Sequence, residues 1–183
     1  LLGFSGFPAA LHEALEAYLD TGGVFQAISL RLQEAPVNSV DLYLSTVLMG
    51  YLGPYCMADA GHTSRLFASG MLEAFVQVVD RARNSEVPPH VSVNRGIGQF
   101  VVAVASSAEG RIRLLATKGM EEALMWLLEH GGDPVGIAEN KTLADPRGMA
   151  GLSLALLRGR EEDAQVALPS QVVRQIVSMI DTY

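Results

Sequence analysis

The sequence predicts an all-α protein built from stacked helical units, and three observations support this fold class. First, a short sequence motif recurs along the 183-residue chain. Its copies begin at Gly23, Gly70, Gly119 and Gln171, with a spacing of about 50 residues. Second, apolar residues inside the copies fall at the i, i+3, i+4 and i+7 spacing of a helix. Third, strand signals are weak, because sustained alternation and Asn-Gly or Asp-Gly hairpin turns are missing.

The recurring motif predicts one long helix in each copy. It reads GMLEAFVQVVD from Gly70 and GMEEALMWLLE from Gly119, and the copies from Gly23 and Gln171 follow it more loosely. One such helix cannot bury its apolar stripe alone, so the copies are expected to stack on one another. The stripe of the helix from Gly70 is made of Leu72, Phe75, Val76 and Val79.

Two further helices complete each predicted unit. A short helix precedes each copy of the recurring motif, and a glycine at the junction permits the sharp change of direction there. In the last copy Pro169-Ser170 replaces this glycine. The short helices are predicted at 11–19, 61–69, 110–118 and 161–168. A longer apolar helix precedes each of the last three short ones, at 40–53, 93–107 and 147–158.

The breaks between helices fall between units. Pro- and Gly-rich stretches occur at 35–39, 84–90 and 131–146, and the last of these is long for an internal loop. We expect one domain over 1–183, with units of roughly 1–53, 54–107, 108–158 and 159–183. Because the chain begins at Leu1 rather than Met, we expect it to be a fragment of, or a subunit within, a larger assembly.

Composition excludes several classes of protein. Apolar residues make up 49% and charged residues 18%, which is typical of a packed domain and not of a disordered one. The net charge of −7 argues against a nucleic-acid partner. One cysteine, Cys56, cannot form an internal disulfide, so we expect an intracellular protein, located in the cytoplasm or, if a targeting segment has been removed, in an organelle. No apolar run approaches the roughly 20 residues of a membrane-spanning helix.

Residues that could carry chemistry are isolated. Ser5 lies in GFSGF, which lacks the second glycine of a nucleophile elbow. Gly96-Ile97-Gly98 lacks the third glycine of a dinucleotide fingerprint and is better explained by close approach of two helices. Cys56 and His62 supply half a metal site at most, and we expect a buried thiol and a capping or surface histidine. We therefore assign no catalytic, cofactor-binding or metal-binding residue.

Charged pairs near helix ends are expected to be solvated. Asp80, Arg81 and Arg83 follow the stripe of the helix from Gly70, and this pattern is typical of a hydrated helix end. Glu121 and Glu122 are adjacent, so they point in different directions on a helix and do not form an acid–base pair.

The three-helix unit resembles the armadillo repeat. The similarity is clearest over 60–129, where LFASGMLEAFVQVVD and LLATKGMEEALMWLLE resemble the junction of the first and second helices and GQFVVAVASSAEG resembles the third. The resemblance implies a right-handed α-superhelix of three and a half to four armadillo-like or HEAT-like repeats, with third helices lining a groove. Peptide-binding members carry a Trp and Asn ladder there, which this sequence lacks, so we do not expect it to recognise nuclear localisation signals.

Candidate partner-binding residues lie on two surfaces. On the third helices, the helical spacing suggests groove-facing positions at Tyr43, Thr46, Gly50, Asn94, Gln99 and Arg147. Trp126 aligns with Leu30 and Gln77 of the other copies, outside the stripe, so we expect it to be partly exposed on the outer face. Exposed tryptophan is enriched at binding hot spots; the alternative is that the loop at 131–146 folds over it.

These observations predict a non-enzymatic scaffold that docks a protein partner within a larger complex, with no cofactor. A second hypothesis is a regulatory or co-chaperone armadillo domain that binds a nucleotide-binding enzyme and modulates it. An enzyme is a third class, and it would require a deep pocket with convergent titratable groups.

Overall fold

The structure is a computed structural model that describes residues 17–19, 23–87, 89–132 and 145–158. Within these ranges all regular structure is helical, which confirms the predicted all-α class. The helices are α2 (Val24–Glu34), α3 (Val40–Cys56), α4 (Ala60–Ala68), α5 (Met71–Arg83), α6 (Val91–Ala105), α7 (Ala108–Ala116), α8 (Met120–His130) and α9 (Pro146–Arg158). The helices predicted at 161–168 and 171–181, and nearly all of that at 11–19, lie outside the described residues.

Polar caps fix where three of the helices begin. The side chains of Ser39, Asp59 and Ser107 each accept a hydrogen bond from a backbone N–H in the first turn of α3, α4 and α7. The donor–acceptor distances are 3.1, 2.8 and 2.8 Å. Each bond satisfies an N–H that has no partner inside the helix. The short first helix of a unit is therefore preceded by an Asp or Ser cap, as α4 and α7 both are.

Two of the three described corner glycines turn the chain in the same way. Gly70 and Gly119 precede α5 and α8 with φ of 73° and 81°, in the left-handed region that favours glycine. Gly23 was predicted to form the same corner, but its φ is −97°, so this prediction is wrong. Any residue adopts that conformation, and the glycine is not needed there.

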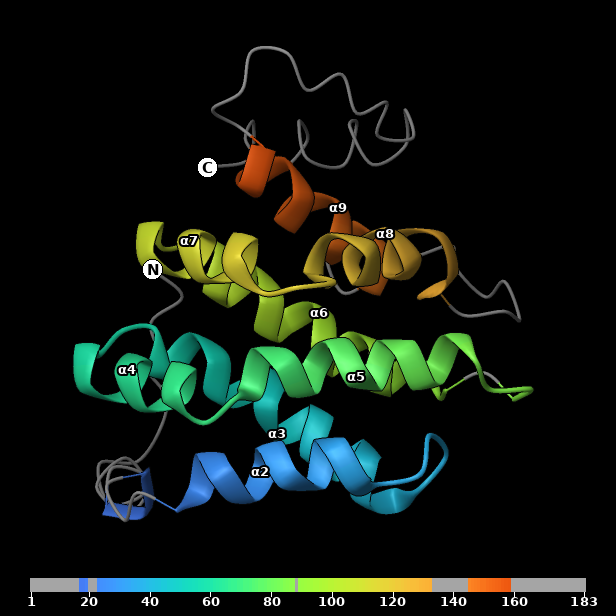
Figure 1. Cartoon of the computed structure of the whole chain (residues 1–183), viewed down its shortest axis with the longest axis horizontal. Helices are drawn as coiled ribbons and strands as arrows, with labels where there is room; N and C mark the ends of the chain where they lie inside the picture. The colour runs from blue at the N-terminus through green and yellow to red at the C-terminus, as the bar shows by residue number, and fades with distance from the viewer. Residues whose placement is uncertain (1–16, 20–22, 88, 133–144, 159–183) are drawn as a thin grey trace.

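The helices pack in two series. Among the second helices, α2 contacts α5 and α5 contacts α8; among the third helices, α3 contacts α6 and α6 contacts α9. Figure 1 shows α2, α5 and α8 rising as successive rows, with α3 and α6 behind them. The core lies between the two series, where Phe25, Phe75 and Phe100 are at most 1% exposed. Each row therefore buries its apolar side against the next and against the helices behind.

Glycines set the spacing of the third helices. A Cβ placed on Gly96 of α6 would lie 2.2 Å from the carbonyl oxygen of Thr46 on α3, and one on Gly98 would lie 2.9 Å from Sδ of Met149 on α9. The prediction that Gly96-Ile97-Gly98 permits close helix approach is confirmed, since this one segment touches a neighbour on either side.

One predicted solvated end is instead a contact between units. The guanidinium of Arg81 on α5 is half-buried and donates to the carbonyl oxygens of Leu32, Gln33 (2.8 Å) and Ala35 (3.5 Å) at the end of α2. These carbonyls have no partner within α2, and a cation is favoured at a helix C-terminus. The prediction of a simply hydrated Arg81 is therefore wrong, because α2 ends against its side chain.

Candidate functional site

An apolar stripe on α3 is open to solvent. Val40, Leu44, Leu48 and Tyr51 lie on one face of the helix, since they follow one another by four, four and three residues. Their side chains are 71, 56, 41 and 63% exposed. Scattered apolar side chains are normal on a surface, but a contiguous strip of four is not. We call these four residues the α3 stripe.

The open faces of α6 and α9 continue this surface. On α6, Gln99 approaches Gly50 of α3, and the half-buried Val102 lies three residues further on. On α9, Met149 approaches Gly98 of α6, and the half-buried Leu152 again lies three residues further on. In both helices the open side lies three residues beyond the residue that approaches the preceding third helix. The open faces of α6 and α9 therefore point in the same direction. The α3 stripe with Gln99, Val102, Leu152 and Leu156 is called the third-helix face below.

Three residues predicted to face the groove are interior. Thr46 is 0% exposed, and its hydroxyl donates to the Leu42 carbonyl oxygen of its own helix at 2.9 Å. Gly50 is buried where α3 meets α6. Asn94 is 4% exposed and donates to the Gly131 carbonyl oxygen at 3.2 Å, which ties α6 to the end of α8. The prediction of a groove-facing position is wrong for these three, because each lies on the side of its helix that packs against a neighbour.

The other three predicted third-helix residues differ in their exposure. Tyr43 is 39% exposed and meets the ring of His90 edge-on, with centroids 6.2 Å apart. Gln99 is half-buried at the margin of the third-helix face. Arg147 is held by Asp145, with 2.9 Å between Nη2 and Oδ2. This hydrogen bond raises the pKa of Arg147, and the clamp fixes the start of α9. Tyr43 and Gln99 therefore remain candidate binding residues, whereas Arg147 is engaged within the chain.

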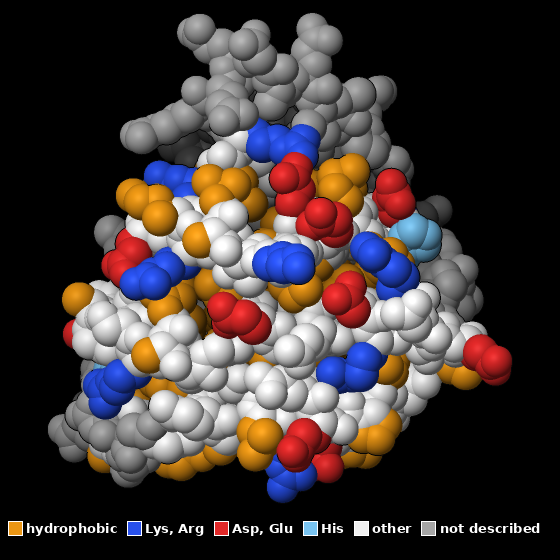
Figure 2. All heavy atoms as spheres, viewed as in Figure 1, with side chains coloured by type: hydrophobic (Ala, Val, Ile, Leu, Met, Phe, Trp, Pro, Cys, Tyr) orange, Lys and Arg blue, Asp and Glu red, His pale blue; other side chains and the backbone are white. Residues whose placement is uncertain are grey.

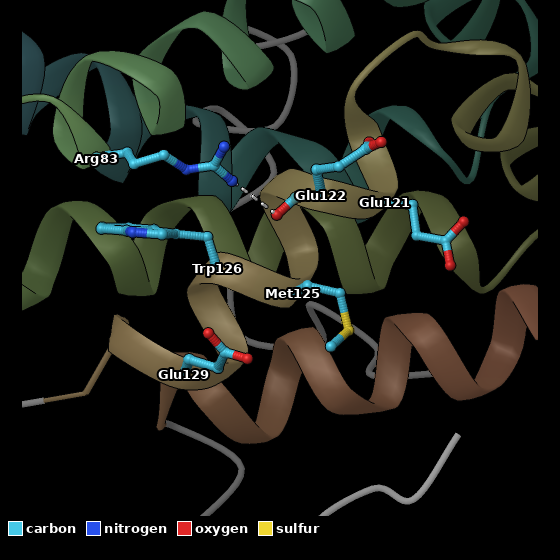
Figure 3. A pocket seen from close by; sticks show the side chains of 6 residues that line it. All are labelled: Arg83, Glu121, Glu122, Met125, Trp126 and Glu129. Carbon is cyan, nitrogen blue, oxygen red and sulfur yellow. Dashed lines mark hydrogen bonds between the residues drawn. The ribbon is translucent and has the colours of Figure 1, made fainter. Parts of the chain in front are cut away.

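Trp126 borders a hollow between α5 and α8. As predicted it is partly exposed, and its ring stacks on that of His130 with centroids 5.3 Å apart and an interplanar angle of 16°. The hollow is shallow, has a volume of about 500 Å³, and is lined by Arg83, Glu121, Glu122, Met125, Trp126 and Glu129 (Figure 3). Most of the loop that was the alternative cover for Trp126 lies outside the described residues. We call this feature the Trp126 hollow.

The charged groups around the hollow come from three helices. Arg83 of α5 donates to the backbone carbonyl oxygen of Glu122 at 3.3 Å (Figure 3). The carboxylate of Glu121 pairs with Arg158 of α9. Glu129 lies 3.8 Å from Nδ1 of His130. The side of the molecule formed by the second helices carries acidic and basic side chains interspersed with apolar ones (Figure 2). The hollow is thus an apolar floor with a mostly acidic rim.

Cys56 and His62 both lie in the interior. The thiol of Cys56 is buried, as predicted. His62 is 2% exposed and lies against the Tyr55 ring with centroids 5.9 Å apart, so the prediction of a capping or surface histidine is wrong. The side chain of Asp59 caps α4 instead. No cluster of three His, Cys, Asp or Glu side chains suited to a metal occurs among the residues the structure describes.

Comparison with known proteins leaves the family open. Family models, curated proteins and solved structures were compared with the chain, and none of them matched. In the described part of the chain, every helix is too short or too polar to cross a membrane.

Proposed function

We propose that the chain is an armadillo-like helical array. The support is the order of its helices: a short helix, a second helix and a third helix occur in turn as α4, α5 and α6 and again as α7, α8 and α9. Second helices pack on second helices and third helices on third. Left-handed glycines stand at two of the junctions between a short and a second helix, before α5 and α8. A repeat that packs only on its neighbours builds an extended surface and no enclosed pocket.

On this array we propose a non-enzymatic function, the docking of a protein partner on the third-helix face. The observation that carries the proposal is the α3 stripe, whose four apolar side chains are each more than 40% exposed. Burial of such a stripe against a partner releases ordered water and stabilises the complex by about 25 cal/mol per Å² of apolar area. Tyr51 in the stripe is an aromatic anchor, which supplies contact area at little cost in side-chain entropy. The partner chemistry that fits the stripe is an apolar helix or extended segment of a larger complex.

The experiment places a charge in the stripe. The double variant Leu44→Glu/Tyr51→Glu and the wild type are used as baits, and the recovered proteins are quantified by mass spectrometry. Both side chains are exposed, so the variant is expected to fold, which circular dichroism checks. A buried unpaired carboxylate costs several kcal/mol, so we expect recovery of the partner to fall by about tenfold or more.

The matched control carries the same charge change elsewhere. Ile112 and Leu115 on α7 are exposed apolar residues, at 67 and 62%, outside the third-helix face. The variant Ile112→Glu/Leu115→Glu is expected to recover the partner as the wild type does. Equal recovery by wild type and Leu44→Glu/Tyr51→Glu would contradict docking on the third-helix face.

A further inference from the structure

We propose that the Trp126 hollow receives an arginine or lysine side chain of a protein partner. The inference rests on the proposed docking function, and it adds the chemistry that the partner presents to a second surface. It is carried by a half-buried indole that lines, together with three glutamates, a hollow with an apolar floor.

The geometry of α8 brings the relevant groups together. Glu122, Trp126 and Glu129 follow one another by four and three residues, so they share one face of the helix. The indole thus has a carboxylate on the turn before it and another on the turn after it. His130 stacks on the Trp126 ring, and Met125 also lines the hollow, with its side chain directed toward α9 (Figure 3). Figure 3 shows the Glu129 carboxylate on the side of the indole, whereas the carboxylates of Glu121 and Glu122 point to the opposite side, so a cation over the ring would meet Glu129 first.

The charges around the hollow favour a cation. Three glutamates and one arginine line it, and Glu121 is already paired with Arg158. No ion pair or hydrogen bond engages the carboxylate of Glu122 within the described part of the chain, and Arg83 bonds to the backbone of that residue rather than to its side chain. Carboxylates beside a low-dielectric apolar floor create a negative potential there. An anionic partner would be repelled, and a purely apolar one would desolvate the carboxylates without pairing them.

An aromatic ring adds to this preference. A guanidinium or ammonium group over an indole is attracted by the ring quadrupole, and tryptophan is the strongest of the aromatic side chains in this respect. The chain uses the same contact internally, where the guanidinium carbon of Arg113 on α7 lies 5.6 Å from the ring centroid of Phe67 on α4. The hollow offers the same chemistry with no internal arginine placed over the indole among the described residues.

The test uses the fluorescence of Trp126, which is the only tryptophan in the sequence. The full 183-residue chain is titrated with an acetylated Arg-Gly repeat peptide, and in parallel with the same peptide carrying uncharged citrulline in place of arginine. We expect a saturable change in emission with the arginine peptide and an affinity at least about fivefold weaker with citrulline, as lost cation–π and ion-pair contacts imply. Equal responses to the two peptides, or no response to either, would overturn the proposal.

Variants of the rim assign the effect to the hollow. Glu122→Gln/Glu129→Gln is expected to weaken binding of the arginine peptide by about fivefold. The control is Glu73→Gln/Glu86→Gln, in which exposed Glu73 occupies the position of Glu122 in the preceding copy, with Gln77 where the later copy has Trp126. Arg83→Gln removes the cation at the rim and is expected to tighten binding. If the two double variants behave alike, or if Arg83→Gln weakens binding, the assignment is wrong.

A third arm separates this inference from the proposed function. Leu44→Glu/Tyr51→Glu changes the third-helix face alone, so it is expected to bind the arginine peptide as the wild type does. Loss of peptide binding in this variant would place the peptide on the third-helix face and overturn the Trp126 assignment, while leaving the docking function itself supported.

Discussion

Gly96 on α6 faces the backbone of Thr46 on α3 so closely that a single added methyl group would lie 2.2 Å from the Thr46 carbonyl oxygen. The contact is with backbone, which cannot rotate away as a side chain can. The spacing of α3 and α6 therefore depends on the absence of a side chain at position 96, and so does the relative placement of the open faces of these two helices.

Replacement of Gly96 by alanine is expected to destabilise the protein strongly. The new methyl group forces α3 and α6 apart, and overpacking of this kind costs about 3 kcal/mol. Urea unfolding followed by circular dichroism measures the change. Gly61→Ala is the matched control, because Gly61 is exposed in α4 and alanine is favoured in a helix. Equal stability of the two variants would contradict the close packing of α3 on α6.

The corner before α8 is expected to require glycine. Gly119 has a φ of 81°, and a Cβ there would also lie 3.1 Å from Cγ1 of Val76 on α5. Gly119→Ala should therefore lower the free energy of unfolding by about 1–2 kcal/mol. Gly23→Ala is the comparison, since Gly23 has a φ of −97° and nothing within 4 Å of its Cβ position. A loss as large at Gly23 as at Gly119 would show that the left-handed corner is not the cause.

The contact of Arg81 with the end of α2 is expected to hold two units together. Arg81→Met keeps the length of the side chain and leaves the carbonyl oxygens of Leu32 and Gln33 without their donor. We expect a loss of about 1–3 kcal/mol in the free energy of unfolding. Lys118→Met removes a charge from an exposed residue and should change stability little. Thermal unfolding of both variants beside the wild type checks this, and the prediction fails if the two melt together.

The cap at Asp59 is expected to make stability depend on pH in the acidic range. The hydrogen bond from the His62 backbone N–H lowers the pKa of Asp59 from its ordinary value of 3.8. The unfolded chain therefore takes up the proton at a higher pH than the folded one, and the contribution of the cap is present above pH 3.8 and lost as the pH falls through the lower, folded pKa.

Asp59→Asn removes this titration. The difference in melting temperature between wild type and Asp59→Asn is expected to be largest near neutral pH and to shrink as the pH falls below 3.8. Asp80→Asn, which alters an exposed carboxylate with no capping role, serves as the comparison. A difference between wild type and Asp59→Asn that stays constant over this range would contradict the role of Asp59.

The sequence was sufficient to locate the described helices but not to orient all of them. In α5 the apolar and polar positions separate cleanly, so both the helix and its buried side follow from the spacing of Leu72, Phe75 and Val79. In α3 apolar residues surround the whole helix, because Val40 and Leu44 face solvent while Leu42 and Met49 face the core. Periodicity cannot choose a side in that case.

The errors at the candidate site have the same origin. Thr46, Gly50 and Asn94 were placed on an open face by helical spacing, yet small residues also allow close helix packing, and buried polar groups can bond to the backbone. The two glycines of Gly96-Ile97-Gly98 did predict close packing of helices. The bond from Arg81 to the end of α2 joins residues more than 40 apart in sequence and depends on how units stack, so no local pattern could reveal it.

The most direct test of the central claim is side-chain footprinting of the chain with and without its recovered partner. Hydroxyl-radical oxidation is measured at Leu44, Leu48 and Tyr51, and at Ile112 and Leu115 on α7 as internal controls. Docking on the third-helix face predicts that the first three are protected several-fold on binding while the two controls are unchanged. Protection confined to α7, or unchanged oxidation of the α3 residues in a saturated complex, would contradict it.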